Sequence, residues 1–298
     1  MEITSAQYHQ TLEGDNDNIK ATIDGVVYHD TLIINQSGGV VNNTSVYVRL
    51  TNTASSGAGG NISCTSTDAT TINIPTGTAQ VNSNVFYVST NGSNSNNGTS
   101  SGTPFLTLKY AISQLSTGCN QIMVAAGTYT DDLIDLTNDH NGLIIKGAGM
   151  ESTIFDQSGT GDHFMEIKSG ATDITISDMT IKDYDENNSG GAIDITSGTV
   201  TIQDIHFDNN RTTSSYDDGG AVYVGSATTA TFDRCKFTNN DVYSNSGSGG
   251  SCIYTEGTLT VKNCLFYDND ASSTNNGLVF LDDGTSTIIN CTFADNTE

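Results

Sequence analysis

The chain of 298 residues contains no tryptophan and only two prolines, and it is short of positive charge. Ten Lys and Arg residues stand against 34 Asp and Glu residues, so the formal net charge at pH 7 is −24. Because phosphate binding requires Lys and Arg to displace counterions, this balance argues against a nucleic-acid partner. The same repulsion disfavours an anionic membrane surface and unassisted binding of an anionic polysaccharide.

Long apolar runs are also missing from the sequence. No segment approaches the ~18 consecutive apolar residues of a transmembrane helix, so we expect no membrane span. The first residues, Met1 to Thr4, lack the basic and apolar regions of a secretory signal. The six cysteines form no Cys-x-x-Cys motif, which excludes zinc-ribbon and thioredoxin-type sites. The acidic, Lys-poor and Asn-rich composition nevertheless predicts an extracellular or cell-surface protein.

Residues 1–84 form the first of three predicted regions. Short β-branched runs such as Val26–Ile34 and Ile62–Ser66 alternate with Gly, Asn and Ser, which predicts a small β-sandwich. Because strands in such a module can pair with a second subunit, we expect this region to serve in assembly by strand exchange.

Residues 85–118 form the second region, which we predict to be a cap. A strand at Val85–Val88 is followed by a polar loop and then by apolar residues at helical spacing between Phe105 and Leu115. Thr103-Pro104 is the expected start of this helix, because Thr is a good N-cap residue and Pro fits the first turn.

Residues 119–298 contain the strongest pattern, an eight-residue segment that recurs five times without gaps. Its copies start at residues 174, 200, 230, 259 and 286, so the spacing drifts between 26 and 30 residues. A Gly-Gly-Ala-(Ile/Val) segment keeps step with it, most clearly at Gly190–Ile193 and Gly219–Val222, and more weakly at Gly249–Cys252. A drifting period of this size predicts a β-solenoid of about six to seven coils with loops of variable length.

Stacking the coils turns each aligned position into a column of side chains about 4.8 Å apart. Three such columns support the predicted stack. In the first, Met179 and Ile205 are followed by three cysteines on the inner side. The second consists of aromatic rings, and the third consists of asparagines whose side-chain amides can hydrogen-bond to one another and to the backbone of the turn. Their members are Cys235, Cys264 and Cys291; Phe207, Phe237, Phe266 and Phe293; and Asn210, Asn240, Asn269 and Asn296. Three cysteines allow at most one disulfide, and we expect buried thiols.

The segment from the strand at residue 85 to Gly127-Thr128-Tyr129 resembles the N-terminal cap of pectin-lyase-like right-handed parallel β-helices. The pairing of Gly-Gly-Ala-(Ile/Val) with Phe-x-x-Asn resembles the repeats of polymorphic outer-membrane proteins, a family of bacterial surface adhesins. The resemblance covers roughly residues 120–298. It implies an all-β fold, a right-handed parallel β-helix with one capping helix, and a surface or adhesive role.

Pectin-lyase-like folds also host hydrolases and lyases, but the motif strings of those enzymes are absent from this sequence. We therefore predict that the chain is not an enzyme. Arg211 with Asp217 and Asp218 is the one acid–base neighbourhood, a candidate loop for a glycan or an ion. Simple inter-coil ion pairs account for Arg234 with Asp204 and for Lys262 with Asp233.

Metals and cofactors have little support in the sequence. The five histidines show no ligand spacing, so no metal site is predicted. Acidic loop pairs could hold Ca²⁺ through oxygen ligands, although solvated loop charge explains them equally simply and is the favoured interpretation. These pairs or groups are Asp15/Asp17, Asp131/Asp132, Asp183/Asp185/Glu186, Asp217/Asp218 and Asp282/Asp283.

The sequence favours a non-enzymatic structural or adhesive protein, a subunit of a surface filament that assembles end to end through its N-terminal segment. Its expected partner is itself or a neighbouring surface protein, with a glycan as a further candidate. Two alternatives stay open. The first is a carbohydrate-active enzyme or carbohydrate-binding module of the pectin-lyase-like fold, and the second is a receptor-binding fragment of a longer adhesin.

Overall fold

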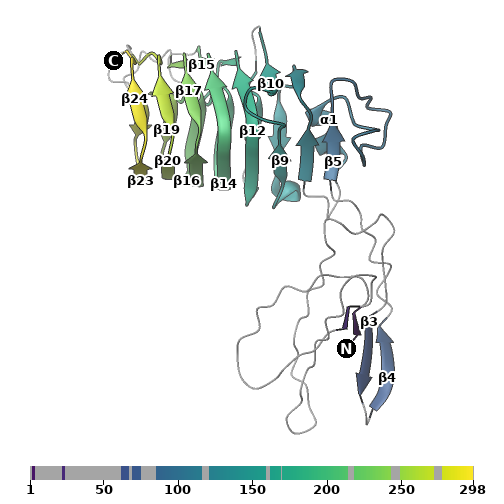
Figure 1. The fold of residues 1–298 in the computed structure, drawn as a ribbon. Coiled ribbons are helices and arrows are strands. Elements are labelled where there is room, and N and C mark those ends of the chain that lie inside the picture. The colour runs from purple at the N-terminus through teal and green to yellow at the C-terminus, as the bar shows by residue number, and fades with distance from the viewer. Residues whose placement is uncertain are drawn as a thin grey trace. The chain divides into compact units, whose positions relative to one another are not determined.

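The computed structural model describes residues 2–3, 22–23, 62–66, 69–74, 85–115, 121–158, 162–168, 170–213, 218–242, 249–271 and 277–297. The chain divides into two compact units, Met1–Ser83 and Asn84–Glu298 (Figure 1). The first contains a sheet in the order β2-β1-β3-β4. Its strands are β1 (Glu2–Ile3), β2 (Thr22–Ile23), β3 (Ile62–Ser66) and β4 (Ala69–Ile74). The predicted β-sandwich falls largely outside the described residues and stays a prediction.

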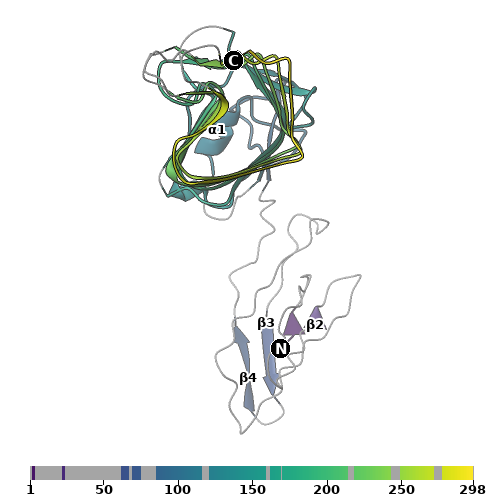
Figure 2. The same cartoon turned by 90° about the vertical axis from the view of Figure 1, so that its left-hand side faces the viewer.

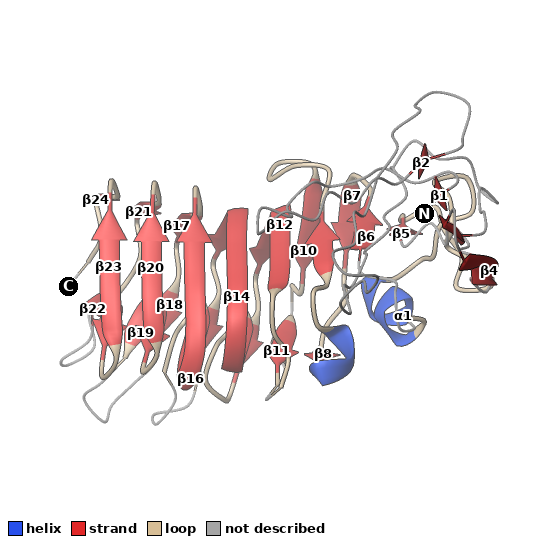
Figure 3. Cartoon of the chain, turned by 90° about the horizontal axis from the view of Figure 1, so that it is seen from below, coloured by secondary structure: helices blue, strands red, loops and turns tan. Residues whose placement is uncertain are grey.

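The second unit is a stack of coils whose strands pair in parallel with the coils before and after them (Figure 3). Three long ladders of strands run along the stack. We number them in the order in which each complete coil passes through them, starting from the coil of residues 134–156. Ladder 1 contains β8 (Ile134–Leu136), β11 (Met165–Ile167), the start of β14 (Ile193–Asp208), the start of β16 (Val222–Asp233), β19 (Gly250–Thr255) and β22 (Gly277–Leu281).

Ladders 2 and 3 follow ladder 1 in each coil. Ladder 2 contains β5 (Val85–Val88), β6 (Gln121–Val124), β9 (Ile144–Lys146), the start of β12 (Ile174–Lys182), the middle of β14, the end of β16, β20 (Thr258–Lys262) and β23 (Thr285–Ile289). Ladder 3 contains β7 (Gly127–Tyr129), β10 (Thr153–Asp156), the ends of β12 and β14, β17 (Lys236–Thr238), β21 (Leu265–Tyr267) and β24 (Thr292–Ala294). A short ladder 4 contains β13 (Asp185–Glu186), β15 (Arg211–Thr212) and β18 (Asp241–Val242).

Seen along the stack, successive coils of the second unit lie over one another and enclose the core (Figure 2). Strand alternation produces this arrangement, because every second side chain points into the coil and the intervening ones point to solvent. On ladder 2, for example, Val200 and Ile202 are fully or almost fully buried, whereas Thr201 between them is half-buried on the outer side. The predicted all-β fold, a right-handed parallel β-helix, is confirmed.

The predicted aromatic column lies on the inner side of ladder 3. Phe207, Phe237, Phe266 and Phe293 occupy paired positions, with ring centroids 4.9, 4.8 and 4.6 Å apart and nearly parallel planes. The first three rings are completely buried. Since a buried aromatic side chain contributes ~1.5–3 kcal/mol through the hydrophobic effect, this column is a principal stabilising element.

The predicted asparagine column forms a continuous chain of hydrogen bonds. The Nδ2 atoms of Asn210, Asn240 and Asn269 donate to the Oδ1 atom of the following Asn at 3.1, 3.0 and 2.9 Å, the last of these being Asn296. Each Oδ1 also accepts from the backbone N–H of the preceding Asn, and each Nδ2 donates to a backbone carbonyl of the preceding coil. The side chains thereby satisfy buried backbone groups that the corner leaves without strand partners.

Two corners of each repeated coil place a non-glycine residue in the left-handed backbone region. Between ladders 2 and 3 these residues are Asp178, Asp204, Arg234, Asn263 and Asn290, with φ between 52° and 61°. Between ladders 3 and 4 they are Asp183, Asn209, Asn239, Asp268 and Asp295, with φ between 53° and 60°. Asn and Asp tolerate this region better than other side chains, which explains why they fill nearly every corner.

Glycine has a specific use at the entrance to ladder 1. Gly190 and Gly219 have φ of +74° and +76°, and a Cβ on Gly191 would lie 2.1 Å from the carbonyl oxygen of Gly220 in the next coil. The third copy of the motif is shifted by one residue from the predicted alignment. Ile253, rather than Cys252, pairs with Val222, because the register slips between Gly250 and Ile253.

The cap contains helix α1 (Leu108–Ser113), which buries Leu108, Ala111 and Ile112 against the first coils. The predicted start at Thr103-Pro104 was wrong: the N-cap is Thr107, whose hydroxyl accepts from the Tyr110 N–H at 3.2 Å. Phe105 cannot join the helix because its backbone N–H and C=O pair with Tyr87 and Ser89 of the adjoining strand segment. A short 3₁₀ helix, η1 (Asn138–His140), lies between ladders 1 and 2 in a later coil.

Candidate functional site

The outer side of ladder 1 carries a continuous row of carboxyl and aromatic side chains. Strand pairing aligns six positions, one per rung, and their sequence neighbours point inward, so the six side chains point outward. We call this set the acidic–aromatic row. Its members, in order, are Asp135, Glu166, Asp194, Tyr223, Tyr254 and Phe280.

The first half of the row consists of three carboxyl groups and one counter-ion. Lys168 lies 3.0 Å from Asp135 and 3.3 Å from Glu166, so it neutralises part of their charge. Asp194 has no such partner among the described residues, and its Oδ1 atom is buried without a hydrogen bond. Burial, followed by the nearby charge of Glu166, raises the pKa of Asp194 from 3.8 to about 7. Asp194 is therefore partly protonated near neutral pH.

The second half of the row is a stack of aromatic rings. The ring centroids of Tyr223 and Tyr254 are 5.6 Å apart with planes 9° from parallel, and those of Tyr254 and Phe280 are 5.5 Å apart with planes 3° from parallel. Burial raises the pKa of both tyrosine hydroxyls, and the negative charges of Glu256 near Tyr223 and of Asp218 and Asp282 near Tyr254 act in the same direction.

The two halves of the row meet between Asp194 and Tyr223, where a short carboxyl side chain lies next to a long aromatic one. We call this junction the step. One face of the Tyr223 ring is covered by Tyr254, whereas the neighbour on the other side is Asp194. An aspartate side chain is too short to cover the outer part of a tyrosine ring that stands on the adjacent strand. The row therefore offers an aromatic face next to a buried carboxyl oxygen that lacks a hydrogen-bond partner. Apolar ring faces beside a few fixed polar groups are the usual composition of a binding site for small cyclic molecules.

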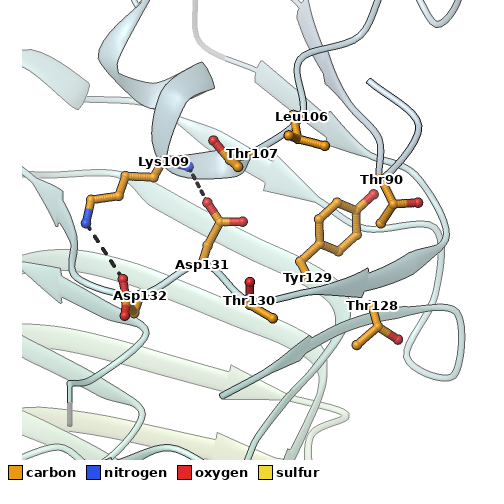
Figure 4. A pocket seen from close by; sticks show the side chains of 9 residues that line it. All are labelled: Thr90, Leu106, Thr107, Lys109, Thr128, Tyr129, Thr130, Asp131 and Asp132. Carbon is orange, nitrogen blue, oxygen red and sulfur yellow. Dashed lines mark hydrogen bonds and ion pairs between the residues drawn. The ribbon is translucent and has the colours of Figure 1, made fainter. Parts of the chain in front are cut away.

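A cavity of about 420 Å³ lies between the cap and the first coils (Figure 4). It is lined by Thr90, Leu106, Thr107, Lys109, Thr128, Tyr129, Thr130, Asp131 and Asp132. Its charged groups are engaged with the protein itself. The Asp131 carboxylate accepts from the backbone N–H of Lys109 at 2.8 Å, and the Lys109 ammonium lies 3.8 Å from Asp132.

These contacts give the acidic residues of the cavity a structural role. Asp131 satisfies backbone donors in the first turn of α1, which a helix start leaves without internal partners. The Tyr129 hydroxyl donates to the Ala125 carbonyl at 2.9 Å, and burial raises the pKa of that phenol to about 12. We therefore regard the acidic–aromatic row, rather than this cavity, as the candidate functional site.

The candidate loop predicted around Arg211 stays a prediction, because Asp217 lies outside the described residues. Arg211 lies on β15 and pairs with Asp185 of the preceding coil, its Nε being 2.9 Å from Oδ2. The long Arg side chain reaches this carboxylate one rung away, as strand stacking allows. The Asp218 N–H donates to Ser189 at 3.2 Å. The two predicted ion pairs are present, with Arg234 Nη2 2.7 Å from Asp204 and Lys262 Nζ 3.7 Å from Asp233.

The cysteine column lies where the sequence predicts it. Cys235 and Cys264 are buried and Cys291 is half-buried, and all three are free thiols. Their sulfur atoms approach backbone groups, as in the contact from Cys291 Sγ to the Ile289 carbonyl at 3.3 Å. Among the described residues, no group of three or more His, Cys, Asp or Glu side chains is arranged to hold a metal ion. Of the proposed Ca²⁺ loops, Asp15/Asp17 and Asp217 lie outside the described residues.

Sequence reasoning missed the acidic–aromatic row. The signal was present, because the residue after each Gly-Gly-Ala-(Ile/Val) segment is Asp194 or Tyr223 in the first two copies. These two residues differ in type, so the outward position does not appear as a repeat in the sequence. The one-residue slip before Ile253 also hid Tyr254, which falls out of the column in a gapless alignment.

Comparison with protein families places the fold. The family model described as "Right handed beta helix region" matches residues 132–298. The chain belongs to this right-handed β-helix family. No curated protein matches the sequence. The finer resemblance to polymorphic outer-membrane adhesins stays a prediction.

Solved structures with a similar fold include a pectin methylesterase in complex with a hexasaccharide (18% identity, TM-score 0.42), which covers 61% of this chain. A rhamnogalacturonan lyase (15% identity, TM-score 0.40) covers 72% of it, and the pectin methylesterase PemA from Erwinia chrysanthemi (16% identity, TM-score 0.30) covers 69%. The chain spans 55%, 62% and 78% of these three proteins. At such identities the likeness concerns the fold alone.

These comparisons contradict the prediction that the chain is not an enzyme. The three solved structures named above are enzymes of the same fold, at 15–18% identity. Missing motif strings were a weak argument, because a β-helix positions catalytic groups by rung rather than by local sequence. None of the helices in the described part of the chain is long and apolar enough to cross a membrane. The predicted extracellular location stays a prediction.

Proposed function

We propose that this protein is a carbohydrate-active enzyme that binds a glycan across the acidic–aromatic row and cleaves it beside Asp194. The observation that carries the proposal is the step in the row. There the buried, hydrogen-bond-free Oδ1 of Asp194 lies between the carboxylate of Glu166 and the open face of Tyr223. A pyranose ring has an apolar C–H face that packs on an aromatic ring and hydroxyl groups that bond to carboxyl oxygens.

The two carboxyl groups differ in the way that glycoside cleavage requires. Asp194, with a pKa of about 7, holds a proton that it can donate to the leaving oxygen. Glu166, 3.3 Å from the Lys168 ammonium, supplies the negative charge that stabilises the developing sugar cation. Aligned positions on neighbouring rungs lie about 4.8 Å apart. Because this spacing leaves little room for a water molecule between the two carboxyl groups, we assign Glu166 as the nucleophile. It bonds to the anomeric carbon as Asp194 protonates the departing oxygen, and a water that gives its proton back to Asp194 then displaces the sugar from Glu166.

Turnover of an oligosaccharide panel tests the proposal. We expect release of new reducing ends by the unaltered protein, and loss of this activity in Asp194→Asn and in Glu166→Gln while oligosaccharide binding persists. Asp295→Asn, an exposed substitution at the last corner between ladders 3 and 4, is the matched control and should keep full activity. Activity that survives both row substitutions would refute the assignment.

Binding tests the aromatic part of the site separately. Tyr223→Ala should weaken oligosaccharide binding, because it removes the ring face at the step. Tyr267→Ala removes a tyrosine that is 42% exposed on ladder 3, and should leave binding unchanged. Equal affinities for the two variants would mean that the sugar does not stack on Tyr223. The earlier prediction of a filament joined through the N-terminal segment stays a prediction, since only Glu2–Ile3 of its first 18 residues are described.

A further inference from the structure

The outer face of ladder 2 carries two in-register columns of threonine. One column contains aligned residues on successive rungs, which are Thr175, Thr201, Thr231, Thr260 and Thr287. The other lies two residues earlier in each strand and contains Thr199, Thr229, Thr258 and Thr285. We call these residues the threonine array. Strands β14, β16, β20 and β23, which lie side by side in Figure 3, therefore each present the pattern Thr-x-Thr on their outer side.

Strand propensity alone does not explain this uniformity. Threonine is favoured in strands in general, so the same preference should act on every ladder. The equivalent outward column of ladder 3 nevertheless contains unlike residues, which are Thr180, His206, Lys236, Leu265 and Thr292. The acidic–aromatic row on ladder 1 is equally mixed. The repetition of threonine is therefore a property of the outer face of ladder 2 and not of strands in this fold.

The array has a fixed two-dimensional geometry. Successive rungs lie about 4.8 Å apart and residues two positions apart on a strand lie about 6.6 Å apart, so the side chains form a nearly rectangular net. Pairing across the array proceeds without a register shift, because the irregularity of β14 lies before Ser197. Threonine is β-branched, which restricts rotation of its side chain. The methyl and hydroxyl groups thus occupy regularly spaced positions.

The hydroxyl groups of the array are open to solvent. Thr199, Thr229, Thr258 and Thr285 are all exposed. Within the described part of the chain, Thr258 and Thr285 approach each other at 3.5 Å between their Oγ1 atoms, and the other hydroxyl groups of the array have no protein partner. A hydroxyl group offers one donor and two acceptor sites. Each can therefore enter a hydrogen-bonded lattice in either role.

Charge and area restrict what can cover the array. The array contains no ionisable group, although the net charge of the chain is −24, and charged residues such as Asp233 and Lys262 begin in the next column. Its four complete rungs cover about 250 Å² by strand spacing, well below the ~800 Å² that each partner contributes to a stable protein complex. Complementarity therefore favours an uncharged occupant that both donates and accepts hydrogen bonds and repeats in two dimensions.

From these observations we propose that the threonine array binds ice. Water molecules are neutral and act both as donors and as acceptors, and the prism faces of hexagonal ice present oxygen atoms on a rectangular net of similar spacing. The hydroxyl groups hold waters at lattice positions, while the methyl groups between them restrict the orientation of the surrounding waters. The array lies on ladder 2 and the acidic–aromatic row on ladder 1, so this inference is independent of the proposed function.

The gap between the melting and freezing temperatures of a single ice crystal, measured in a solution of the full chain, tests the inference. We expect a gap that grows with protein concentration, together with adsorption of the fluorescently labelled protein on the prism faces of an ice hemisphere. Thr229→Lys places a long charged side chain at an exposed position inside the array and should abolish both effects, as should Thr258→Lys on the next rung. Thr292→Lys makes the same change at an exposed position on ladder 3 and should leave both effects unchanged. Circular dichroism of each variant establishes that the β-helix is intact.

The results distinguish this inference from its alternatives. Absence of both effects in the unaltered protein would overturn the inference and leave the proposed glycan site untouched. A gap that survives in Thr229→Lys and Thr258→Lys, or that is lost equally in Thr292→Lys, would also overturn it, because the array would not be the binding surface. Adsorption to crystalline cellulose but not to ice, lost in Thr229→Lys, would assign the array to a crystalline polysaccharide instead. Loss of oligosaccharide turnover in Thr229→Lys would join the array to the glycan site and contradict the inference as well.

Discussion

Replacement of Asn240 by Ala tests whether the asparagine column stabilises the solenoid. The substitution removes four hydrogen bonds of a completely buried side chain. Two are donated by Nδ2, to the Phe207 carbonyl and to Asn269 Oδ1, and two are accepted by Oδ1 from Asn210. At about 1 kcal/mol net for each bond, the expected loss in the free energy of unfolding is about 4 kcal/mol. Part of this loss arises because the Asn210 backbone N–H is left buried without its acceptor.

Urea unfolding followed by circular dichroism measures this loss, and neighbouring residues supply controls. Asn296→Ala removes three bonds from a half-buried side chain and should cost about half as much. Asn239→Gly removes one exposed bond to Asp208 and keeps the left-handed backbone at φ 56°, so we expect a loss below ~1 kcal/mol. A cost for Asn240→Ala no greater than that for Asn239→Gly would refute the reasoning.

Three further predictions concern charge, packing and corners. Burial raises the pKa of Asp194 from 3.8 to about 7, so the folded protein binds more protons than the unfolded chain between these pH values, and its stability falls as the pH rises from 4 to 7. Urea unfolding midpoints measured across this range should fall less in Asp194→Asn than in the unaltered protein. An identical pH profile for the two proteins would contradict the raised pKa. Phe237→Ala removes a ring whose centroid lies 4.9 and 4.8 Å from those of its neighbours, and it should lower the free energy of unfolding in urea by about 3–5 kcal/mol. Tyr267→Ala removes an exposed ring and should lower it by less than ~1 kcal/mol. Equal losses would contradict a stabilising role for the buried aromatic column. Arg234→Asn places a residue suited to φ 54° at the corner while removing the ion pairs with Asp204 and Asp233, so the thermal midpoint should stay unchanged. A large drop would show that these ion pairs contribute more to stability than the backbone conformation.

The sequence was sufficient to predict ladders 2 and 3, because their inward columns repeat nearly the same residue types. Phe207, Phe237, Phe266 and Phe293 recur in identical positions, and no other arrangement stacks them all. Asp and Asn recur at the corner positions in the sequence, and ion pairs between side chains were used to explain some of them. The reason that they recur is the left-handed backbone conformation of the corners. The φ of 54° at Arg234 shows that the position, and not the residue, sets that conformation.

The candidate site was harder to predict, because it is formed by different residue types that share a position. Glu166, Asp194 and Tyr223 have no common chemistry, so a search for repeated residues passes over them. Only strand pairing shows that they are adjacent, and the slip before Ile253 shifts the next member out of alignment. For Arg211, closeness in sequence to Asp217 and Asp218 did not reveal the partner that the structure shows, which is Asp185 in the preceding coil.

The in-register stacking of the coils also determines how such a protein can change in evolution. Each coil contacts only its neighbours, and Asn210 and Asn240 occupy equivalent places in successive coils. Duplication or loss of the segment between two such equivalent points leaves every column continuous across the junction. Duplication of the segment from Asn210 to Asn240 adds one residue to the acidic–aromatic row and keeps Tyr223 next to Asp194, whereas its loss removes Tyr223. Under the proposed function, such a duplication would lengthen the bound segment of glycan without altering the two carboxyl groups assigned to cleavage.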